Sequence, residues 1–482
     1  MIAPTAHQSS LFYLAFAREA QLIKDDLLDE IDSLLNDDEL VGIGRKALAS
    51  RAPRSASRGR FGSMGPDQLV RACALKHIRG WSFRELEREL RGSLVYRRFT
   101  RFDGGRIPTY KTFACSFALL GDEGTSAIHE RLVRRAIEEK VVRGFRLRTD
   151  TTVVESNVHY PTDSTLLGDG IRVLTRTLGR LAQECQKGAV KVVDHARSTK
   201  HRILEIHRAA KSLRITGRER LKDGYRRLLG IACGVARQAE QVSAKLDVGK
   251  LELDGEGSLA RVLGLDEQLR HFTPLVRKVI AQTKARVFGG DRHVEGKVLS
   301  LFEEHTAAIC KGKAHKPTEF GRLVRVDEAE NGIVSHYDVQ DGNPADTRSF
   351  MPAIAQHKKT FGRAPRTATA DRGFYSAANV REAEQAGVKK VAVQARGRLS
   401  QKQAERQKER WFQRAMRWHA GIEARIATLK HRFGMARTFY KSDRGFKRFV
   451  GWSVIAQNLV AIARAKARRK ATRDGQQAKR AA

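Results

Sequence analysis

Strand-like segments occur in two distant parts of this chain, with a long helical stretch between them. The first is the short β-prone run Phe145–Val154, and two more, Phe320–Val326 and Ile333–Val339, lie on either side of the turn-forming pair Asn331-Gly332. Between residues 169 and about 310, apolar residues recur at helical spacing and proline is almost absent. We therefore predict a sheet whose first strand is separated from the others by a helical insert.

After the second strand pair, predicted helices and strands alternate. They are a helix at 345–359, a strand ending at Asp371, a helix at 377–386, a strand at 390–394, a helix that carries Glu423, and a last helix at 449–463. This order is typical of an α/β layered core, in which carboxylates at strand ends lie beside an incoming helix. The predicted fold class is α/β, with a mixed-sheet core split by a large helical insert and preceded by an all-helical region.

Three acidic residues occupy predicted elements of this core. Asp150 lies in the first strand, Asp371 ends a later strand, and Glu423 lies on a helix that continues to Lys430. Burying a carboxylate is costly unless a cation offsets it, and a bound metal commonly does so where several acids converge. We interpret the three acids as a metal site acting on phosphates. The alternative is an exposed strand-end or turn position for each aspartate and an ordinary helix position for the glutamate.

The charge balance indicates a polyanionic partner. The 482 residues include 91 lysines and arginines against 54 aspartates and glutamates, a formal net charge of +37. Such a charge attracts nucleic acid, and solubility alone needs far less. The sequence has neither a long uncharged apolar stretch nor a signal-peptide pattern, so we expect no membrane span and a cytoplasmic, nucleoid-associated protein.

A possible DNA-reading element precedes the core. Ser82 and Glu85 form a capping-box pattern that starts a helix after a glycine-containing break. This helix would expose Arg84 and Arg88 as the second helix of a helix-turn-helix, although any small helical bundle has the same spacing.

The predicted organisation has six parts. They are a helical arm and basic linker at 1–60, a helical DNA-binding domain at 61–140, the first part of the core at 141–169, the helical insert at 170–310, the second part of the core at 311–465, and a basic disordered tail at 466–482.

The residues around the three acids resemble a known family. Asp371 begins the run Asp-Arg-Gly-Phe-Tyr, and Lys430 follows Glu423 by seven residues; further matching stretches are Asp150–Asp163, Lys311–Gly321 and Gly342–Asp346. Together they are similar to bacterial insertion-sequence transposases with a DDE ribonuclease-H-like catalytic core, in the groups of insertion sequences four and five or their unclassified relatives. Residues 66–120 are similar to the helical domain that often precedes this core.

The resemblance implies metal-dependent phosphoryl transfer on DNA. Two Mg²⁺ (or Mn²⁺) ions, about 4 Å apart, would clamp the attacking and leaving oxygens, with Asp150 bridging both, Asp371 completing one site and Glu423 the other. Water would free a transposon 3′-hydroxyl, which would then attack target DNA without a covalent protein–DNA intermediate. The implied partners are double-stranded transposon ends and target DNA, bound by a homodimer.

Basic residues near the acids are candidate DNA contacts. Lys430 lies two helical turns from Glu423 on nearly the same face and would pair with a phosphate, with a solvated helix lysine as the alternative. Arg372 would touch DNA or support a turn.

One position departs from the family pattern. The related signature has tyrosine at position 416 and arginine at position 419, whereas this chain has Met416 and His419. We therefore expect His419 or Arg417 to supply the basic DNA contact at this place.

Two other functions remain open at this stage. A nuclease that cuts without joining would share all three acids, and a DNA-packaging protein would share the charge and the insert without needing the acids. Joining assays distinguish the first from a transposase, and a metal-dependent nick distinguishes both enzymes from the second.

Overall fold

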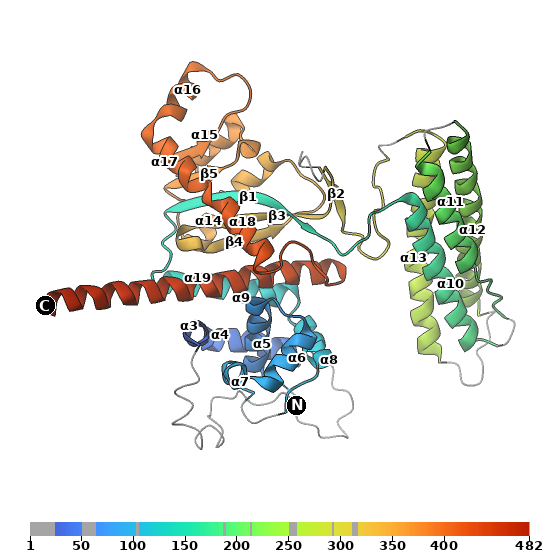
Figure 1. The fold of residues 1–482 in the computed structure, drawn as a ribbon, viewed down its shortest axis with the longest axis horizontal. Coiled ribbons are helices and arrows are strands. Elements are labelled where there is room, and N and C mark those ends of the chain that lie inside the picture. Colours follow the sequence, from blue (N-terminus) through green and yellow to red (C-terminus); the bar gives the residue numbers. More distant parts are fainter. Residues whose placement is uncertain are drawn as a thin grey trace. The chain divides into compact units, whose positions relative to one another are not determined.

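The computed structural model describes residues 25–50, 64–102, 106–186, 189–212, 215–249, 258–291, 294–310 and 317–481. It divides into two compact units (Figure 1). One combines the described residues up to Asn157 with those from Ala307 onward, and the other is Val158–Thr306. The insert thus begins at Val158, before the predicted boundary at 170, because the chain leaves the sheet soon after its first strand.

Short helices form the N-terminal part of the first unit. They are α3 (Asp26–Leu35), α4 (Asp38–Ala49), α5 (Pro66–Arg79), α6 (Phe83–Gly92), α7 (Leu94–Thr100), α8 (Tyr110–Leu119) and α9 (Gly121–Glu138). The predicted capping box starts α6: the Ser82 hydroxyl accepts from the Glu85 amide, and the Glu85 carboxylate accepts from the Ser82 amide. Gly80 ends α5 with φ +72°, a left-handed conformation that glycine adopts without steric cost.

The acidic residues of the predicted arm pair with arginines of the same unit. Asp32 on α3 lies 2.5 Å from Arg71, whose side chain is fully buried, and Asp25 lies 2.7 Å from Arg79. The described portion of the arm is therefore packed into the helical region by ion pairs as well as by its apolar face. The rest of the arm and most of the predicted basic linker lie outside the described residues.

The rest of the first unit, as far as it is described, consists of a six-stranded mixed sheet and the helices that cover it. Its strands are β1 (Arg146–Glu155), β2 (Ala307–Ile309), β3 (Glu319–Glu328), β4 (Val334–Val339), β5 (Thr367–Ala370) and β6 (Lys390–Val393). The order is β2-β3-β1-β5-β6, with β4 also paired to β3. β3 is antiparallel to β1, β2 and β4, whereas β5 is parallel to β1 and β6 is parallel to β5. The predicted α/β mixed-sheet core, consistent with a ribonuclease-H-like fold, is confirmed.

The two faces of the sheet are covered by different helices. Helices α14 (Phe350–Phe361) and α15 (Ala377–Gln385) pack on one face, where Leu147 and Ala368 meet Phe350 and Ile354. On the other face lie α17 (Arg410–His419) and α18 (Gly421–His431), preceded by α16 (Gln401–Lys408). Charged and polar side chains share that second face with an apolar cluster.

Helix α19 (Ser442–Ala481) belongs to two apolar clusters at once. Its Phe446 and Val450 pack with Val326 of the sheet, while Trp452 and Leu459 lie in the core of the N-terminal helices. The sheet and the N-terminal helices therefore share one closing helix.

In the residues that the structure describes, the insert consists of four long helices. They are α10 (Asp163–Glu184), α11 (Ala196–Ala210), α12 (Ile215–Asp247) and α13 (Leu259–Val287). The leucines predicted from helical spacing, such as Leu174, Leu178 and Leu228, are fully buried in its core. The predicted helical insert is confirmed.

Two sequence expectations differ from the structure. The three-residue strand β2 was not predicted, because so short a segment shows no alternation. The tail predicted to be disordered continues α19 to Ala481, and its alanine, arginine, lysine and glutamine residues have high helix propensity. No helix among the described residues combines the length and apolar character that crossing a membrane requires.

Candidate active site

Strand pairing brings the two aspartates side by side. In the parallel pair β1–β5, Thr149 lies opposite Ala370, and the next residues on the two strands are Asp150 and Asp371. Neighbouring strands are about 4.8 Å apart, so the two residues sit next to each other where β5 ends. Asp150 is half-buried, and the Asp371 side chain is 60% exposed at the start of the short helix Arg372–Phe374.

The same register places both aspartates on the face covered by α17 and α18. Asp150 pairs with Val326, whose side chain packs with Leu429 of α18. Thr369, two residues before Asp371, contacts His419 of α17. Because residues two apart on a strand share a face, Asp371 points to the side that these helices cover.

Glu423 lies in the first turn of α18 and is exposed. The buried Ile422 and Leu429 fix the side of the helix that faces the unit's interior. Within the described residues, no three His, Cys, Asp or Glu side chains are gathered so that they could hold one metal ion. The structure therefore pairs the two aspartates on adjacent strands and brings the helix of Glu423 onto their face, without closing the three carboxylates into one cluster.

His419 has a different environment from the one predicted. It is only 3% exposed, its Nε2 lies 2.8 Å from Asp371 Oδ1, and its Nδ1 lies 3.2 Å from the Thr369 hydroxyl. The prediction that His419 contacts DNA is therefore not supported, because both ring nitrogens are used inside the protein. The other expected basic residue, Arg417, is exposed on α17.

A buried ion-pair network lies beneath the junction of α17 and α18. Glu328 on β3 is fully buried and accepts two hydrogen bonds from Arg148, at 2.6 and 3.0 Å, while Arg425 of α18 lies 3.4 Å away. Arg148 also donates to the carbonyl oxygen of Trp418 at 2.5 Å and lies over its ring. A Cβ atom at Gly421 would clash with the Arg148 guanidinium, so the absence of a side chain at the start of α18 leaves room for this group.

Sequence reasoning missed this network. Two signals were present: Arg148 precedes Asp150 by two residues and thus shares its face, and Glu328 is a further acid at the end of a β-prone run. Their pairing depends on the β1–β3 register, which places Arg148 opposite Glu328. The sequence does not reveal that register.

Another acid occupies the opposite face of the sheet. Asp327 is fully buried, lies 3.1 Å from Arg325 and accepts a hydrogen bond from Thr149 at 2.6 Å. Burial raises the pKa of Asp327, and these partners act against that rise. Its bonds are satisfied within the fold, which indicates a structural acid.

The two residues predicted to contact phosphate near the aspartates, Lys430 and Arg372, differ in their surroundings. Lys430 is half-buried near the end of α18. Arg372 is exposed as a residue, but its Nε donates to the Ala395 carbonyl oxygen at 3.0 Å. Arg396 in turn donates to the Arg372 carbonyl oxygen at 2.9 Å, so Arg372 supports the turn after Asp371.

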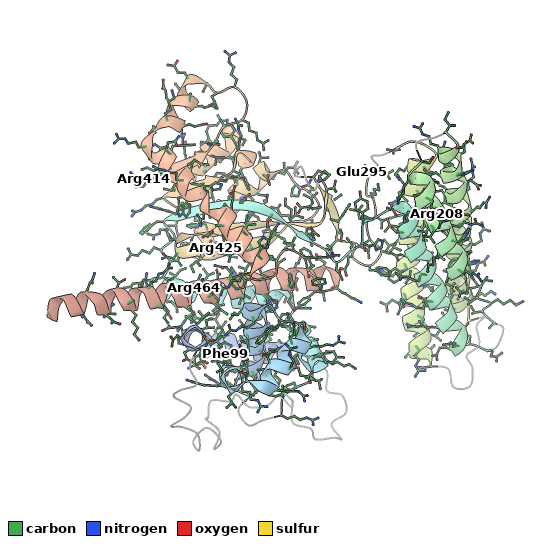
Figure 2. All side chains as sticks on the ribbon, viewed as in Figure 1. Phe99, Arg208, Glu295, Arg414, Arg425 and Arg464 are labelled. Carbon is green, nitrogen blue, oxygen red and sulfur yellow. The ribbon has the colours of Figure 1, made fainter. Side chains whose placement is uncertain are left out.

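The predicted DNA-reading arginines lie on the exposed side of α6. Arg84 lies over the Tyr110 ring at 4.9 Å, and Arg88 forms an exposed ion pair with Glu89 at 2.9 Å. Exposed basic side chains also occur on α17, α19 and the insert, for example Arg414, Arg464 and Arg208 (Figure 2). Positive charge is thus exposed on both units.

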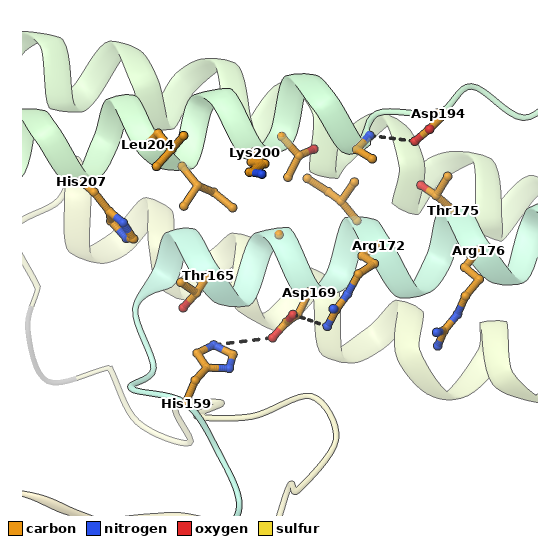
Figure 3. Close-up of a pocket in the computed structure, with 15 residues that line it drawn as sticks. His159, Thr165, Asp169, Arg172, Thr175, Arg176, Asp194, Lys200, Leu204 and His207 are labelled. Carbon is orange, nitrogen blue, oxygen red and sulfur yellow. Dashed lines mark hydrogen bonds and ion pairs between the residues drawn. The ribbon is translucent and has the colours of Figure 1, made fainter.

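The insert contains a cavity of about 830 Å³ between α10 and α11 (Figure 3). Ile171, Ile203 and Leu204 supply apolar lining, and Asp169 lies 2.6 Å from Arg172 and 3.6 Å from His159. Burial raises the pKa of Asp169, opposed by these two neighbours. None of the three predicted catalytic acids lines this cavity.

Two family models match separate regions of the chain. The family described as Transposase DDE domain matches residues 311–459, which include Asp371 and Glu423, and the family described as Transposase domain (DUF772) matches residues 16–117. The first match begins after the insert and so leaves out β1 and Asp150. No curated protein and no solved structure matched the chain. On the evidence of these two matches and of the mixed sheet, the chain belongs to the insertion-sequence DDE transposases, enzymes that act on DNA.

Proposed function

We propose that this transposase cuts the ends of its own element and joins them to target DNA by metal-dependent phosphoryl transfer. The observation that carries the proposal is the adjacency of Asp150 and Asp371 on parallel strands, with α18 and Glu423 on the same face. This arrangement supplies hard oxygen ligands from a rigid sheet, as Mg²⁺ and Mn²⁺ require. The net charge of +37 supports a DNA substrate.

The donor set fits a divalent metal site. Asp150, Asp371 and Glu423 would hold two Mg²⁺ or Mn²⁺ ions, which when bound would activate an attacking oxygen and stabilise a leaving one. The protein's own part is to position these carboxylates. The sheet fixes Asp150 and Asp371 by register, and α18 carries Glu423 on a helix anchored through Leu429 and Arg425.

Other residues would bind and orient the DNA. Lys430 would hold a phosphate near the reacting bond, and Arg372 would contribute charge beside Asp371 while it supports the turn. Arg84 and Arg88 on α6 would contact the transposon end, and two copies of the chain would bring two ends together in a homodimer on the nucleoid. The exposure of α6 supports this assignment.

The test is a cleavage and joining assay on labelled DNA that carries the element's flanking ends, with Mg²⁺ or Mn²⁺. Asp150→Asn, Asp371→Asn and Glu423→Gln should bind DNA but neither cut nor join it. Glu382→Gln, on the exposed side of α15, is the matched control for a neutralised helix acid and should behave as wild type. Cutting without joining by the wild type would favour a nuclease. An active Glu423→Gln variant would remove Glu423 from the site, and DNA binding without metal-dependent cutting would favour a packaging protein.

A further inference from the structure

A buried histidine is bonded directly to one of the two adjacent aspartates. His419 Nε2 lies 2.8 Å from Asp371 Oδ1, and the imidazole is 3% exposed. The histidine comes from the last residue of α17, whereas Asp371 follows β5, so the bond joins a helix to the sheet at the candidate site. Asp371 itself is 60% exposed, and the bond to His419 restricts the rotation of its carboxylate.

The Asp371 carboxylate determines which ring nitrogen of His419 carries the proton, and the second nitrogen contacts Thr369. The Thr369 Oγ1 lies 3.2 Å from Nδ1 and 3.4 Å from the Leu147 carbonyl oxygen, so the imidazole is its nearer partner. A carboxylate only accepts, so the nitrogen facing Asp371 must be the donor. In the neutral ring, Nδ1 is then an acceptor, and the single hydrogen of the Thr369 hydroxyl is directed either to it or to the Leu147 carbonyl oxygen.

The backbone beside His419 is held as well. Arg148 donates to the carbonyl oxygen of Trp418, and Arg148 is bound by the buried Glu328. The sheet therefore fixes the position of the imidazole through two separate contacts. One is the contact of the His419 ring with Thr369, and the other is the hydrogen bond from Arg148 to the backbone of Trp418.

We infer that His419 is a positioning residue that holds one oxygen of Asp371 and so directs the other toward a bound divalent cation. This inference rests on the proposed function, because it assigns Asp371 as a metal ligand. A partner that orients a ligating carboxylate commonly changes metal affinity by about 10- to 100-fold when it is removed. His419 acts through Asp371, in place of the DNA contact expected from the sequence.

The test uses glutamine and asparagine as replacements for one ring nitrogen each. The side-chain amide nitrogen of His419→Gln reaches the place of Nε2 and retains the donor to Asp371, whereas His419→Asn reaches only the place of Nδ1. The assay measures Mn²⁺ binding to the full chain without DNA, using the electron paramagnetic resonance signal of the free ion. The Mn²⁺ affinity of the glutamine variant should be near that of the wild type. The affinity of the asparagine variant should be about 10- to 100-fold weaker.

His357 provides the matched control. It is 2% exposed and its Nε2 lies 3.0 Å from the Gly144 carbonyl oxygen, so it is similarly buried and bonded through Nε2, but to a carbonyl oxygen and not to a carboxylate. His357→Asn should lose stability in a thermal melt and keep its Mn²⁺ affinity. Equal weakening by His357→Asn and His419→Asn would overturn the inference, because the effect would then be general destabilisation.

The remaining outcomes separate the inference from the proposed function. If Asp371→Asn weakens Mn²⁺ binding while His419→Asn does not, the positioning role is wrong and the proposed metal site stands. If Asp371→Asn also leaves binding unchanged, or the wild type binds no Mn²⁺, the proposed function itself fails. If His419→Gln does not fold, Thr369→Val replaces it: the loss of the hydroxyl that orients the ring should weaken Mn²⁺ binding, and an unchanged affinity would overturn the inference.

Discussion

The two units of this transposase place their charges differently. In the catalytic unit, charged side chains such as Arg148, Arg325 and Glu328 are buried within the sheet and paired there. In the insert, the core is mainly aliphatic and ion pairs such as Arg277–Glu240 lie on the outside, with Asp163, paired with Arg286, as a buried acid. A helical bundle can be held by apolar packing alone, whereas a site that must orient carboxylates needs directional contacts inside the fold. The difference predicts that equivalent substitutions have unequal effects in the two units.

The largest expected difference is between removing a buried acid from the catalytic unit and removing an exposed acid from the insert. Glu328→Ala leaves Arg148 buried without its anion and should cost about 3–5 kcal/mol of unfolding free energy. Glu240→Ala breaks an exposed pair with Arg277 in the insert and should cost about 0–1 kcal/mol. Calorimetric unfolding of the two variants measures both values. Similar losses would mean that burial of the charge does not distinguish the units.

The pH dependence of stability should also differ between the units. Burial lowers the pKa of His129 in the catalytic unit to about 4, and its Nε2 is bonded to the Val334 carbonyl oxygen. The unfolded chain, with an ordinary histidine pKa near 6.5, binds a proton that the folded protein does not. The contribution of His129 to the free energy of unfolding is thus fully present above about pH 6.5 and decreases as the pH falls from there to about 4.

Denaturant unfolding between pH 7 and pH 4 tests this assignment. His129→Gln should reduce the decrease in stability with falling pH, and His201→Gln, at an exposed position of α11, is the matched substitution in the insert. A His129→Gln curve that runs parallel to that of the wild type would contradict the assigned pKa.

Two glycine substitutions should have opposite signs. Gly421→Ala places a methyl group against the Arg148 guanidinium and should cost about 1–3 kcal/mol and reduce DNA cutting. Gly234→Ala, on α12 of the insert, has open space around the new atom and should stabilise its helix by about 0.5–1 kcal/mol. Thermal melts of both variants decide the signs, and a stabilising Gly421→Ala would show that Arg148 moves freely.

The smallest effects are expected for single exposed cations. Arg84→Ala on α6 should weaken binding to the transposon end and lower the slope of log affinity against log salt by about 1, with little change in stability. Arg208→Ala is the corresponding change in the insert. Titrations of labelled DNA at several salt concentrations measure both slopes. A change in the Arg208 variant alone would assign the DNA contact to the insert.

Local patterns were enough to predict much of this structure. The Ser82–Glu85 capping box, the helical repeats around Leu174 and the strand containing Asp150 all depend on residues close in sequence, and each is found as predicted. For the same reason, Asp371 was correctly placed at the end of a strand.

The contacts that organise the site could not be predicted in this way. The pairing of Arg148 with Glu328 joins residues 180 positions apart and depends on the β1–β3 register. The bond between His419 and Asp371 depends on how α17 lies on the sheet. Sequence spacing placed His419 near the site, but its burial, which excludes the predicted DNA contact, is a property of the tertiary packing.

Helix α19 packs with both the sheet and the N-terminal helices, and this affects the order in which the parts of the protein fold on the ribosome. The insert has its whole apolar core within residues 166–301, so it has all its packing partners as soon as that stretch has been synthesised. The sheet and the N-terminal helices both need side chains of α19, including Val450 and Trp452, which are translated much later. Because domains generally fold as units during synthesis, the insert should already be folded on a nascent chain whose catalytic unit has not yet folded. The enzyme should therefore acquire its active site in one late step, when α19 docks.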